Sequence, residues 1–443
     1  MDLITSAIVA AIEHGAPDMA TPDIRYRYEQ LKAAIQDRAT DAQAILAAIK
    51  ALEADPASAP QRLLLQQQLS TANAAGDMAL LFAAQELRHQ IDLVVQPAAR
   101  GAAPVQAPSP AMTNEADYAT VKVFFATDRK LDASQPVDRR FGGLRGAAVS
   151  YGSCDISIPR DHRMGQLESK SLWRLEFRND PAKHVLLLAS TVQDQDDFFA
   201  TLSAQLQAAS QQSALLFVHG YNVSFEDAAR RTGQISYDLG FGGVPLFYSW
   251  PSQGDVAAYI VDEGNIEWSQ PHMTAFLSDV LSKTDAQNVY LIAHSMGNRG
   301  MTRAIAALVE QQPALAQRLT EIILAAPDID AEVFKRDIAP ALTRHQNPVT
   351  LYASSEDMAL AAAKKVYGYP RAGDSGSGMV IIDGIETVDA TGVDTSFMKH
   401  AYFAEKYSAL SDIFYLIKDN KRADQRLLQR IDVAAGHYWT FKK

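Results

Sequence analysis

Short apolar runs alternate with stretches of helical periodicity through most of the chain after residue 115. The clearest runs occupy residues 214–218, 245–250, 288–293, 321–325, 349–353 and 379–382. The strands of a parallel sheet that is covered on both faces need such continuous apolar runs, and helical crossovers must connect them. The pattern therefore predicts an α/β fold with a mostly parallel sheet.

Three earlier segments, 121–125, 148–158 and 184–188, are further strand candidates. The sheet is thus expected to contain about eight strands and to lie within residues 115–418. Residues 405–430 have helical periodicity and are expected to form a final helix. The pattern of residues 436–443 favours neither a helix nor a strand.

The first 96 residues have a different pattern. Apolar residues recur there at helical spacing, as in Leu31 and Ile35, which predicts a small all-helical domain. Residues 97–112 are rich in proline and alanine and lack apolar periodicity, which is typical of an extended linker. The chain is therefore expected to divide into a helical domain (1–96), this linker, and an α/β domain (113–443). We expect the helical domain to bind a second copy of the chain or another protein.

Charge and cysteine content exclude several kinds of site. Asp and Glu total 52 against 41 Lys and Arg, a formal net charge of −11, which argues against a nucleic-acid-binding protein or one bound to anionic membranes. Cys154 is the only cysteine, so neither an intramolecular disulfide nor a thiolate-rich metal site can form. The sequence contains no H-E-x-x-H, P-loop or G-x-G-x-x-G motif, so we expect neither a metal nor a cofactor.

The N-terminus and the hydropathy of the chain bear on its location. No run approaches the roughly 18 apolar residues that a membrane-spanning helix needs. The N-terminal apolar patch has no lysine or arginine before it, which favours a short helix over a signal peptide. We therefore expect a cytoplasmic protein without a transmembrane segment.

The most informative motif is Ala293-His294-Ser295-Met296-Gly297. It follows the apolar run 288–293 and precedes a helix-compatible stretch. In this context a sharp strand–turn–helix bend exposes a nucleophilic serine. Such a bend brings the residues two before and two after the serine close together, so both must be small, as alanine and glycine are. We therefore predict that Ser295 is a nucleophile.

A serine nucleophile requires a general base, which is usually a histidine. His345, His400 and His437 follow Ser295 in the sequence. His345 precedes an expected strand, and His437 lies near the C-terminal end behind the expected final helix. His400 lies in a loop after the last expected core strand, so we predict that it is the base and keep His437 as the less favoured alternative.

The carboxylate that orients this histidine should follow the penultimate strand. The chain order in folds with such a bend is serine, acid, histidine. The run 349–353 leads into a polar segment that contains Asp357, which is the predicted acid. Asp328 and Asp330, which follow the preceding run, remain alternatives.

The negative charge that develops on the substrate oxygen needs two backbone N–H donors. One donor is expected to be Met296, the residue after the nucleophile. The other is expected in the loop of residues 219–222, where Gly220 lets the backbone turn close to a ligand, and Tyr221 is the candidate. His219 is expected to hold this loop in place.

Aromatic residues near these loops are candidates for binding the substrate. Trp250 ends an expected strand, and Tyr259 and Trp268 lie in the long stretch that follows it. Core packing is the alternative for each. Residues 327–348 match a plain helical crossover, so no large cap is expected there. The glycine-rich segment 367–378 is expected to be either a mobile rim over the site or a plain surface loop.

Five segments together resemble the serine α/β-hydrolase superfamily: HGYN (219–222), YSWPSQG (248–254), AHSMGN (293–298), LAAPDID (324–330) and LYASSEDMAL (351–360). More narrowly, these segments and VFFATDR (123–129) and YPRAGD (369–374) resemble a bacterial esterase/lipase-like family of formerly unknown function. The resemblance covers about residues 118–418. It implies an α/β-hydrolase fold, a triad and two oxyanion donors, which fall on Ser295, Asp357, His400, Tyr221 and Met296. The N-terminal region loosely resembles helical modules attached to diverse bacterial effector proteins.

These features predict a serine hydrolase that cleaves carboxylic esters through an acyl-enzyme. The expected substrate is a small-molecule or lipid-like ester. An acyltransferase with the same triad is the nearest alternative. A scaffold or effector protein whose helical domain recruits a partner is the other.

Overall fold

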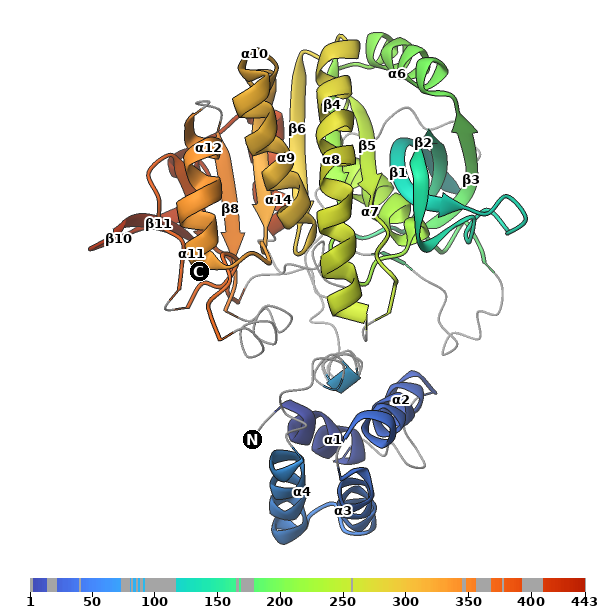
Figure 1. The fold of residues 1–443 in the computed structure, drawn as a ribbon, viewed down its shortest axis with the longest axis vertical. Coiled ribbons are helices and arrows are strands. Elements are labelled where there is room, and N and C mark those ends of the chain that lie inside the picture. Colours follow the sequence, from blue (N-terminus) through green and yellow to red (C-terminus); the bar gives the residue numbers. More distant parts are fainter. Residues whose placement is uncertain are drawn as a thin grey trace. The chain divides into compact units, whose positions relative to one another are not determined.

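The structure is a computed structural model of the chain. It describes residues 3–13, 22–39, 41–72, 80, 83–84, 87, 91, 117–164, 167–168, 179–255, 258–344, 348–355, 368–376, 378–392 and 409–442. The chain divides into two compact units, and the principal division falls after Ala103. Helices make up the first unit and a large sheet lies in the second (Figure 1). The expected linker, residues 97–112, lies outside the described residues.

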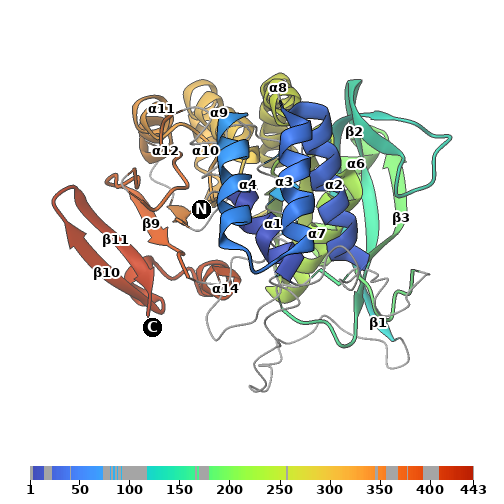
Figure 2. The ribbon, with the colours of Figure 1, turned by 90° about the horizontal axis from the view of Figure 1, so that it is seen from below.

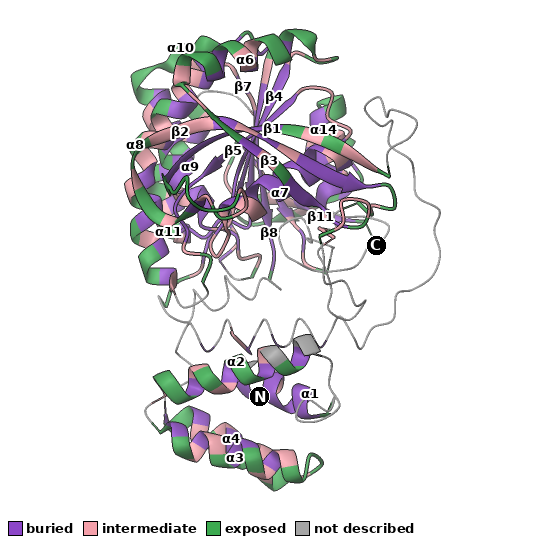
Figure 3. Cartoon of the chain, turned by 90° about the vertical axis from the view of Figure 1, so that its right-hand side faces the viewer, coloured by how far each residue is buried: buried purple, intermediate pink, exposed green. Residues whose placement is uncertain are grey.

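The first unit includes the helices α1 (Leu3–Glu13), α2 (Pro22–Arg38), α3 (Ala42–Ala54) and α4 (Ala59–Thr71). Each turns an apolar stripe towards a shared core, whose fully buried members include Ile8, Leu31, Ile49 and Leu69. The outer faces of α3 and α4 are exposed, as the green segments in Figure 3 show. The predicted helical character of this region is confirmed.

The second unit is built on an 11-stranded sheet in the order β10-β11-β9-β8-β7-β6-β4-β5-β1-β2-β3. Its strands are β1 (Tyr118–Leu131), β2 (Phe141–Pro159), β3 (Leu186–Gln193), β4 (Ser213–Val218), β5 (Val244–Ser249), β6 (Asn288–His294), β7 (Leu319–Ala325), β8 (Val349–Ala353), β9 (Ile385–Asp389), β10 (Leu428–Val433) and β11 (Gly436–Phe441). The strands from β11 to β1 in this order run parallel to one another. Antiparallel strands complete the two edges. The predicted α/β fold is confirmed, with more strands than expected.

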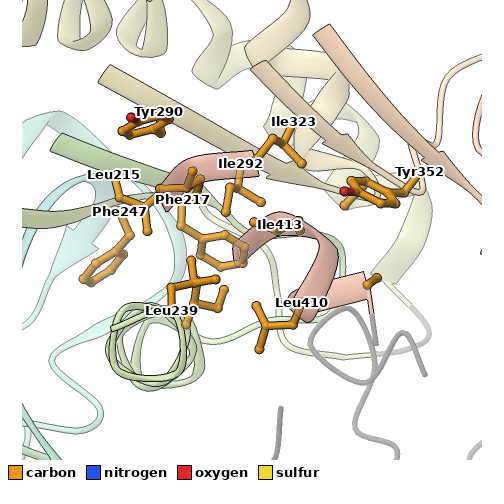
Figure 4. Packing of buried hydrophobic residues seen from close by; sticks show 14 of the residues in the cluster. Leu215, Phe217, Leu239, Phe247, Tyr290, Ile292, Ile323, Tyr352, Leu410 and Ile413 are labelled. Carbon is orange, nitrogen blue, oxygen red and sulfur yellow. The ribbon is translucent and has the colours of Figure 1, made fainter. Parts of the chain in front are cut away.

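Helices cover both faces of the sheet, as the apolar strands require. They are α6 (Gln195–Ala208), α7 (Phe225–Asp238), α8 (Tyr259–Lys283), α9 (Gly297–Gln311), α10 (Pro313–Ala316), α11 (Ala331–Val333), α12 (Ala339–Arg344) and α14 (Ala409–Asp419), with a π-helical turn at Phe334–Ile338 and a 3-10 turn at Ala423–Gln425. On one face α7 and α14 enclose a core with Phe217, Ile292 and Ile413 (Figure 4). On the other face lie α8 and α9 (Figure 1), where Phe276 of α8 packs on Tyr248 of β5.

The last expected core strand is wrong. The apolar run 379–382 forms a loop, in which Val380 is fully buried. The strand begins only at Ile385, after Gly384, whose φ of +86° favours glycine. The apolar run therefore reflects burial of a loop rather than extended pairing.

The expected helix over residues 405–430 is only partly correct. Helix α14 ends at Asp419, and β10 begins at Leu428. Residues 436–441 pair with β10 as a hairpin at one edge of the sheet, drawn in red in Figure 2. An edge strand buries few side chains, and most of β10 is exposed. It therefore lacks the apolar run by which the central strands are predicted.

A buried histidine ties the segment after β2 to helix α7. The side chain of His162 is almost fully buried, and its two ring nitrogens lie 2.7 Å from Glu168 Oε2 and 2.7 Å from Asp238 Oδ1. Burial alone would lower the pKa of His162, but the hydrogen bonds and charges of the two carboxylates outweigh it and raise the pKa to about 9. The protonated ring therefore links both carboxylates at neutral pH.

We expect the protein to become less stable in alkaline solution, because this link is lost there. Because the pKa of His162 is higher in the folded than in the unfolded state, its stabilisation is complete below about pH 6.5 and is lost as the pH rises through about 9. The raised pKa corresponds to a stabilisation on the order of 3 kcal/mol. Urea unfolding across this pH range measures the loss, and His162→Gln should reduce the stability at pH 6.5 and flatten the decline. An identical decline in both proteins would contradict the assignment.

Candidate active site

Ser295 lies in the sharp turn between β6 and α9. Its φ of +49° is in the left-handed region, which a serine adopts only at a cost. Two backbone hydrogen bonds hold the turn: Ser295 N–H donates to the Ala325 carbonyl at 2.9 Å, and its own carbonyl accepts from Asp328 N–H at 3.2 Å. The strand–turn–helix bend expected from the sequence is therefore present, with the serine at its apex.

Small residues allow this turn to form against the loop after β4. A Cβ on Gly297 would lie 2.3 Å from the carbonyl oxygen of His219, and a Cβ on Gly220 would lie 2.9 Å from Ser295 Cβ. Ala293 is also buried, between β4 and β7. The backbone of the loop therefore approaches the serine more closely than any side chain would permit.

Replacing Gly297 by alanine should destabilise the bend. The added methyl group would collide with the His219 carbonyl, which is backbone and cannot rotate away. We expect a loss of about 2–3 kcal/mol in unfolding free energy, measured by urea denaturation. Gly264→Ala on α8 is the matched control, because its Cβ would meet only an arginine side chain at 3.5 Å. Equal stability of the two variants would contradict the close approach.

The loop after β4 rests on Trp250. The indole lies parallel to the ring of His219, with 5.1 Å between ring centroids, and its N–H donates to the His219 carbonyl at 2.8 Å. Trp250 has no exposed surface, so it supports the loop from beneath. Core packing, the alternative considered for Trp250, describes it better than contact with substrate.

The two expected oxyanion donors flank the serine. Met296 is the N-cap residue of α9, and the first amides of a helix have no acceptor within it. Tyr221 follows Gly220 in the loop, its hydroxyl donates to the Asp255 carbonyl at 3.2 Å, and its ring contacts that of Tyr259. Both residues therefore remain candidates, with their backbones on two elements that meet at Ser295.

Asp357 and His400 lie outside the described residues. The strands that precede them end at Ala353 and Asp389, and both strands run parallel to β6. Parallel strands end at the same edge of a sheet, which is the edge where Ser295 lies. The positions of these two strands are therefore consistent with the predicted acid and base, which stay predictions.

The alternative base lies near the opposite ends of the parallel strands. His437 is the second residue of β11, which runs parallel to β9. It therefore lies near the amino ends of the parallel strands, whereas Ser295 follows a carboxyl end. His345 lies outside the described residues.

The alternative acids already have other partners. Asp328 is buried, accepts a hydrogen bond from Tyr259 Oη at 2.6 Å, and lies 3.2 Å from Arg299 Nη2. Asp330 caps α11, since its Oδ1 accepts the N–H groups of the second and third residues that follow it. Both carboxylates therefore already hold groups in or beside the loop after β7, and the assignment of Asp357 as the acid stays a prediction.

The segment YPRAGD is anchored rather than a mobile rim. The amides of Ala372 and Gly373 donate to the carbonyls of Ile329 and Pro327 at 2.8 and 2.9 Å. Arg371 is buried, with its Nε 3.3 Å from Asp328 Oδ1. These contacts fix the segment to the loop after β7, so the expectation of a mobile rim is wrong for residues 370–374.

The remaining substrate-binding candidates lie on α8. Tyr259 is buried, and burial together with the charge of Asp328 raises its pKa, which keeps the phenol protonated. The ring of Trp268 packs edge-to-face against that of His272, and the guanidinium of Arg145 lies over the Trp268 ring. Tyr259 therefore belongs to the surroundings of the bend, whereas the contacts of Trp268 are with β2 and its own helix.

Three arginines were not expected from the sequence as parts of this site. Arg299 and Arg371 contact Asp328, and Arg129 lies beneath the loop after β4. Two of them sit in the segments VFFATDR and YPRAGD, whose roles the sequence left open.

Among the described residues no group of three His, Cys, Asp or Glu side chains is arranged to hold a metal ion. Nor is any helix in that part of the chain both long and apolar enough to cross a membrane.

Solved structures with similar folds are distant. The match to a predicted CIB-like hydrolase from Thermoplasma acidophilum has 15% identity and a TM-score of 0.28, and covers 48% of this chain and 86% of that one. An esterase from Pyrobaculum calidifontis has 11% identity, a TM-score of 0.27, and coverage of 48% and 78%. A fungal esterase from Rhizomucor miehei has 11% identity, a TM-score of 0.31, and coverage of 68% and 84%.

Two family models match the sequence. The Het-E N-terminal domain matches residues 1–126, which include helices α1 to α4 and the first part of β1. The family described as "Alpha/beta hydrolase of unknown function (DUF900)" matches residues 194–417, which include the bend at Ser295 and the loop after β4. No curated protein matches the sequence. The resemblance seen in the sequence motifs is confirmed: the chain belongs to the DUF900 family of α/β hydrolases.

Proposed function

We propose that this α/β hydrolase cleaves carboxylic esters by serine catalysis. The observation that carries the proposal is the left-handed turn at Ser295, pressed against the backbone of Gly220. A strained serine at the end of a central parallel strand, beside a loop that can supply an N–H donor, is the arrangement that acyl transfer needs.

The proposed reaction proceeds through an acyl-enzyme. Ser295 Oγ attacks the ester carbonyl carbon while His400 takes the hydroxyl proton, and Asp357 orients the imidazole and stabilises its charged form. The N–H groups of Met296 and Tyr221 donate to the oxyanion. The tetrahedral intermediate expels the alcohol, which receives the proton from His400. Water then attacks the acyl-enzyme with His400 as base, which releases the carboxylic acid and restores the serine.

The substrate is proposed to be a small-molecule or lipid-like ester. The described part of the crossover after β7, residues 326–344, supports access for such a molecule, because it consists of α11, a π-helical turn and α12. Within residues 327–344 there is thus no inserted cap domain over the serine.

The experiment is a panel of p-nitrophenyl esters of increasing acyl length, together with labelling by a fluorophosphonate. We expect saturable hydrolysis and covalent modification of the peptide that contains Ser295, identified by mass spectrometry. Adding a soluble alcohol as a competing acceptor separates a hydrolase from an acyltransferase, because only the latter would form mainly the new ester. A label on another residue, or hydrolysis no faster than in buffer, would overturn the proposal.

A further inference from the structure

Arg129 is a buried arginine at the carboxyl end of β1. Only 1% of it is exposed, and among the described residues no carboxylate forms a direct ion pair with it. Its five N–H groups face five acceptors: Ser249 Oγ at 2.8 Å, the carbonyls of Gly142, Ser252 and Val223 at 3.0, 2.8 and 2.7 Å, and His219 Nε2 at 3.5 Å. A guanidinium offers five donors, so all of them are used here.

The hydrogen bonds continue from Arg129 into the loop after β4. Burial, and then the charge of Arg129, hold the pKa of His219 well below its usual value, so the ring is neutral. His219 Nδ1 lies 2.8 Å from the Gly220 carbonyl oxygen, which can only accept, so Nδ1 carries the proton. Nε2 is therefore an acceptor, and Ser249 Oγ lies 3.1 Å from it. Arg129 Nε donates to Ser249, which donates to His219, which donates to Gly220.

This series of hydrogen bonds ends at the peptide unit that contains the proposed oxyanion donor. The Gly220 carbonyl and the Tyr221 N–H belong to one trans peptide, because the described residues contain no cis peptide, and so they point in opposite directions. Fixing the oxygen towards His219 thus turns the Tyr221 N–H away from the buried ring. Hydrogen bonds in series also polarise one another, so a donor on the carbonyl strengthens the N–H as a donor.

We propose that Arg129 is a positioning residue for the oxyanion hole, acting through Ser249, His219 and the Gly220–Tyr221 peptide to orient and polarise the Tyr221 N–H. This inference rests on the proposed ester hydrolysis. It gives a role to the arginine of VFFATDR, and it predicts a defect confined to the transition state. Lysine cannot replace Arg129, because its three donors cannot meet five acceptors.

The test compares the wild type with Arg129→Lys and Ser249→Ala. Ser249→Ala removes the hydroxyl that links Arg129 Nε to His219 and leaves only the 3.5 Å contact between Arg129 Nη2 and His219 Nε2. This variant serves if the arginine variant does not fold, which circular dichroism checks. Three quantities are measured: kcat, KM, and the affinity for a trifluoromethyl ketone, which a serine attacks to form a tetrahedral oxyanion. We expect kcat to fall by about 10–100-fold with little change in KM. Affinity for the ketone should fall by the same factor as kcat/KM.

Three further variants exclude a general structural effect. Arg318→Lys is the matched control, because Arg318 also donates to backbone carbonyls. These carbonyls belong to Leu281, Thr284 and Ala286, at the carboxyl end of α8. Its kcat and ketone affinity should stay within about twofold of the wild type. His219→Asn keeps an N–H near the Gly220 oxygen and should recover part of the activity that His219→Leu loses.

The outcomes separate the two proposals. A wild type that hydrolyses no ester and binds no ketone would overturn the proposed function itself. An active wild type whose Arg129→Lys and Ser249→Ala variants raise KM alone, or lose ketone affinity no more than Arg318→Lys does, would overturn only the role of Arg129.

Discussion

Replacing Ser295 by alanine should abolish ester hydrolysis and fluorophosphonate labelling together. The substitution removes the hydroxyl oxygen that is proposed to form the acyl-enzyme. Losses of about 10⁴-fold or more in kcat are typical when a nucleophilic serine is removed. Alanine and serine tolerate the left-handed turn about equally. The fold should therefore persist with a similar unfolding free energy.

The control for this variant is Ser278→Ala. Ser278 lies on α8, and its hydroxyl donates to Gln312 Oε1 at 3.2 Å. Its loss should leave both hydrolysis and labelling at wild-type levels. Labelling that persists in the Ser295→Ala protein would move the nucleophile to another residue.

The second large effect is expected from Asp357→Asn. An asparagine in place of the orienting carboxylate favours the wrong imidazole tautomer and no longer stabilises the imidazolium. The corresponding change in a serine protease lowers kcat by about 10⁴-fold. We expect a loss of similar size in steady-state kinetics, with the protein still folded and with KM largely unchanged.

Asp330→Asn provides the comparison. Asp330 is the N-cap of α11, and asparagine is as good an N-cap residue as aspartate. This variant should therefore keep its stability and lose less than about tenfold in activity. If Asp330→Asn were the more damaging change, the acid would lie after β7 rather than after β8.

The bend at Ser295 was predictable because its signal is local. The apolar run of β6 predicts a buried strand, and the small residues Ala293 and Gly297 allow the turn. Both features lie within ten residues and depend only on strand periodicity and side-chain size. The central parallel strands were predictable for the same reason, since each is buried and contains a short apolar run.

The edges of the sheet and the support of the loop were not predictable in this way. Strand β10 is largely exposed, so its sequence carries no apolar run. Arg129 meets Ser249 and His219, which lie 120 and 90 positions further along the chain. No periodicity links residues so distant, and a buried arginine in a strand looks in the sequence like the solvated end of that strand.

The backbone angle at residue 295 also limits which nucleophiles this fold can acquire. Threonine is excluded in practice, because a branched Cβ is strongly disfavoured at φ +49°. Cysteine presents no such branch, and aspartate is among the residues that enter the left-handed region most readily. Substitution of this one residue by cysteine or aspartate could thus place a thiol or a carboxylate at the same apex. Related sequences could therefore acquire a cysteine or an aspartate nucleophile at this position, but not a threonine nucleophile.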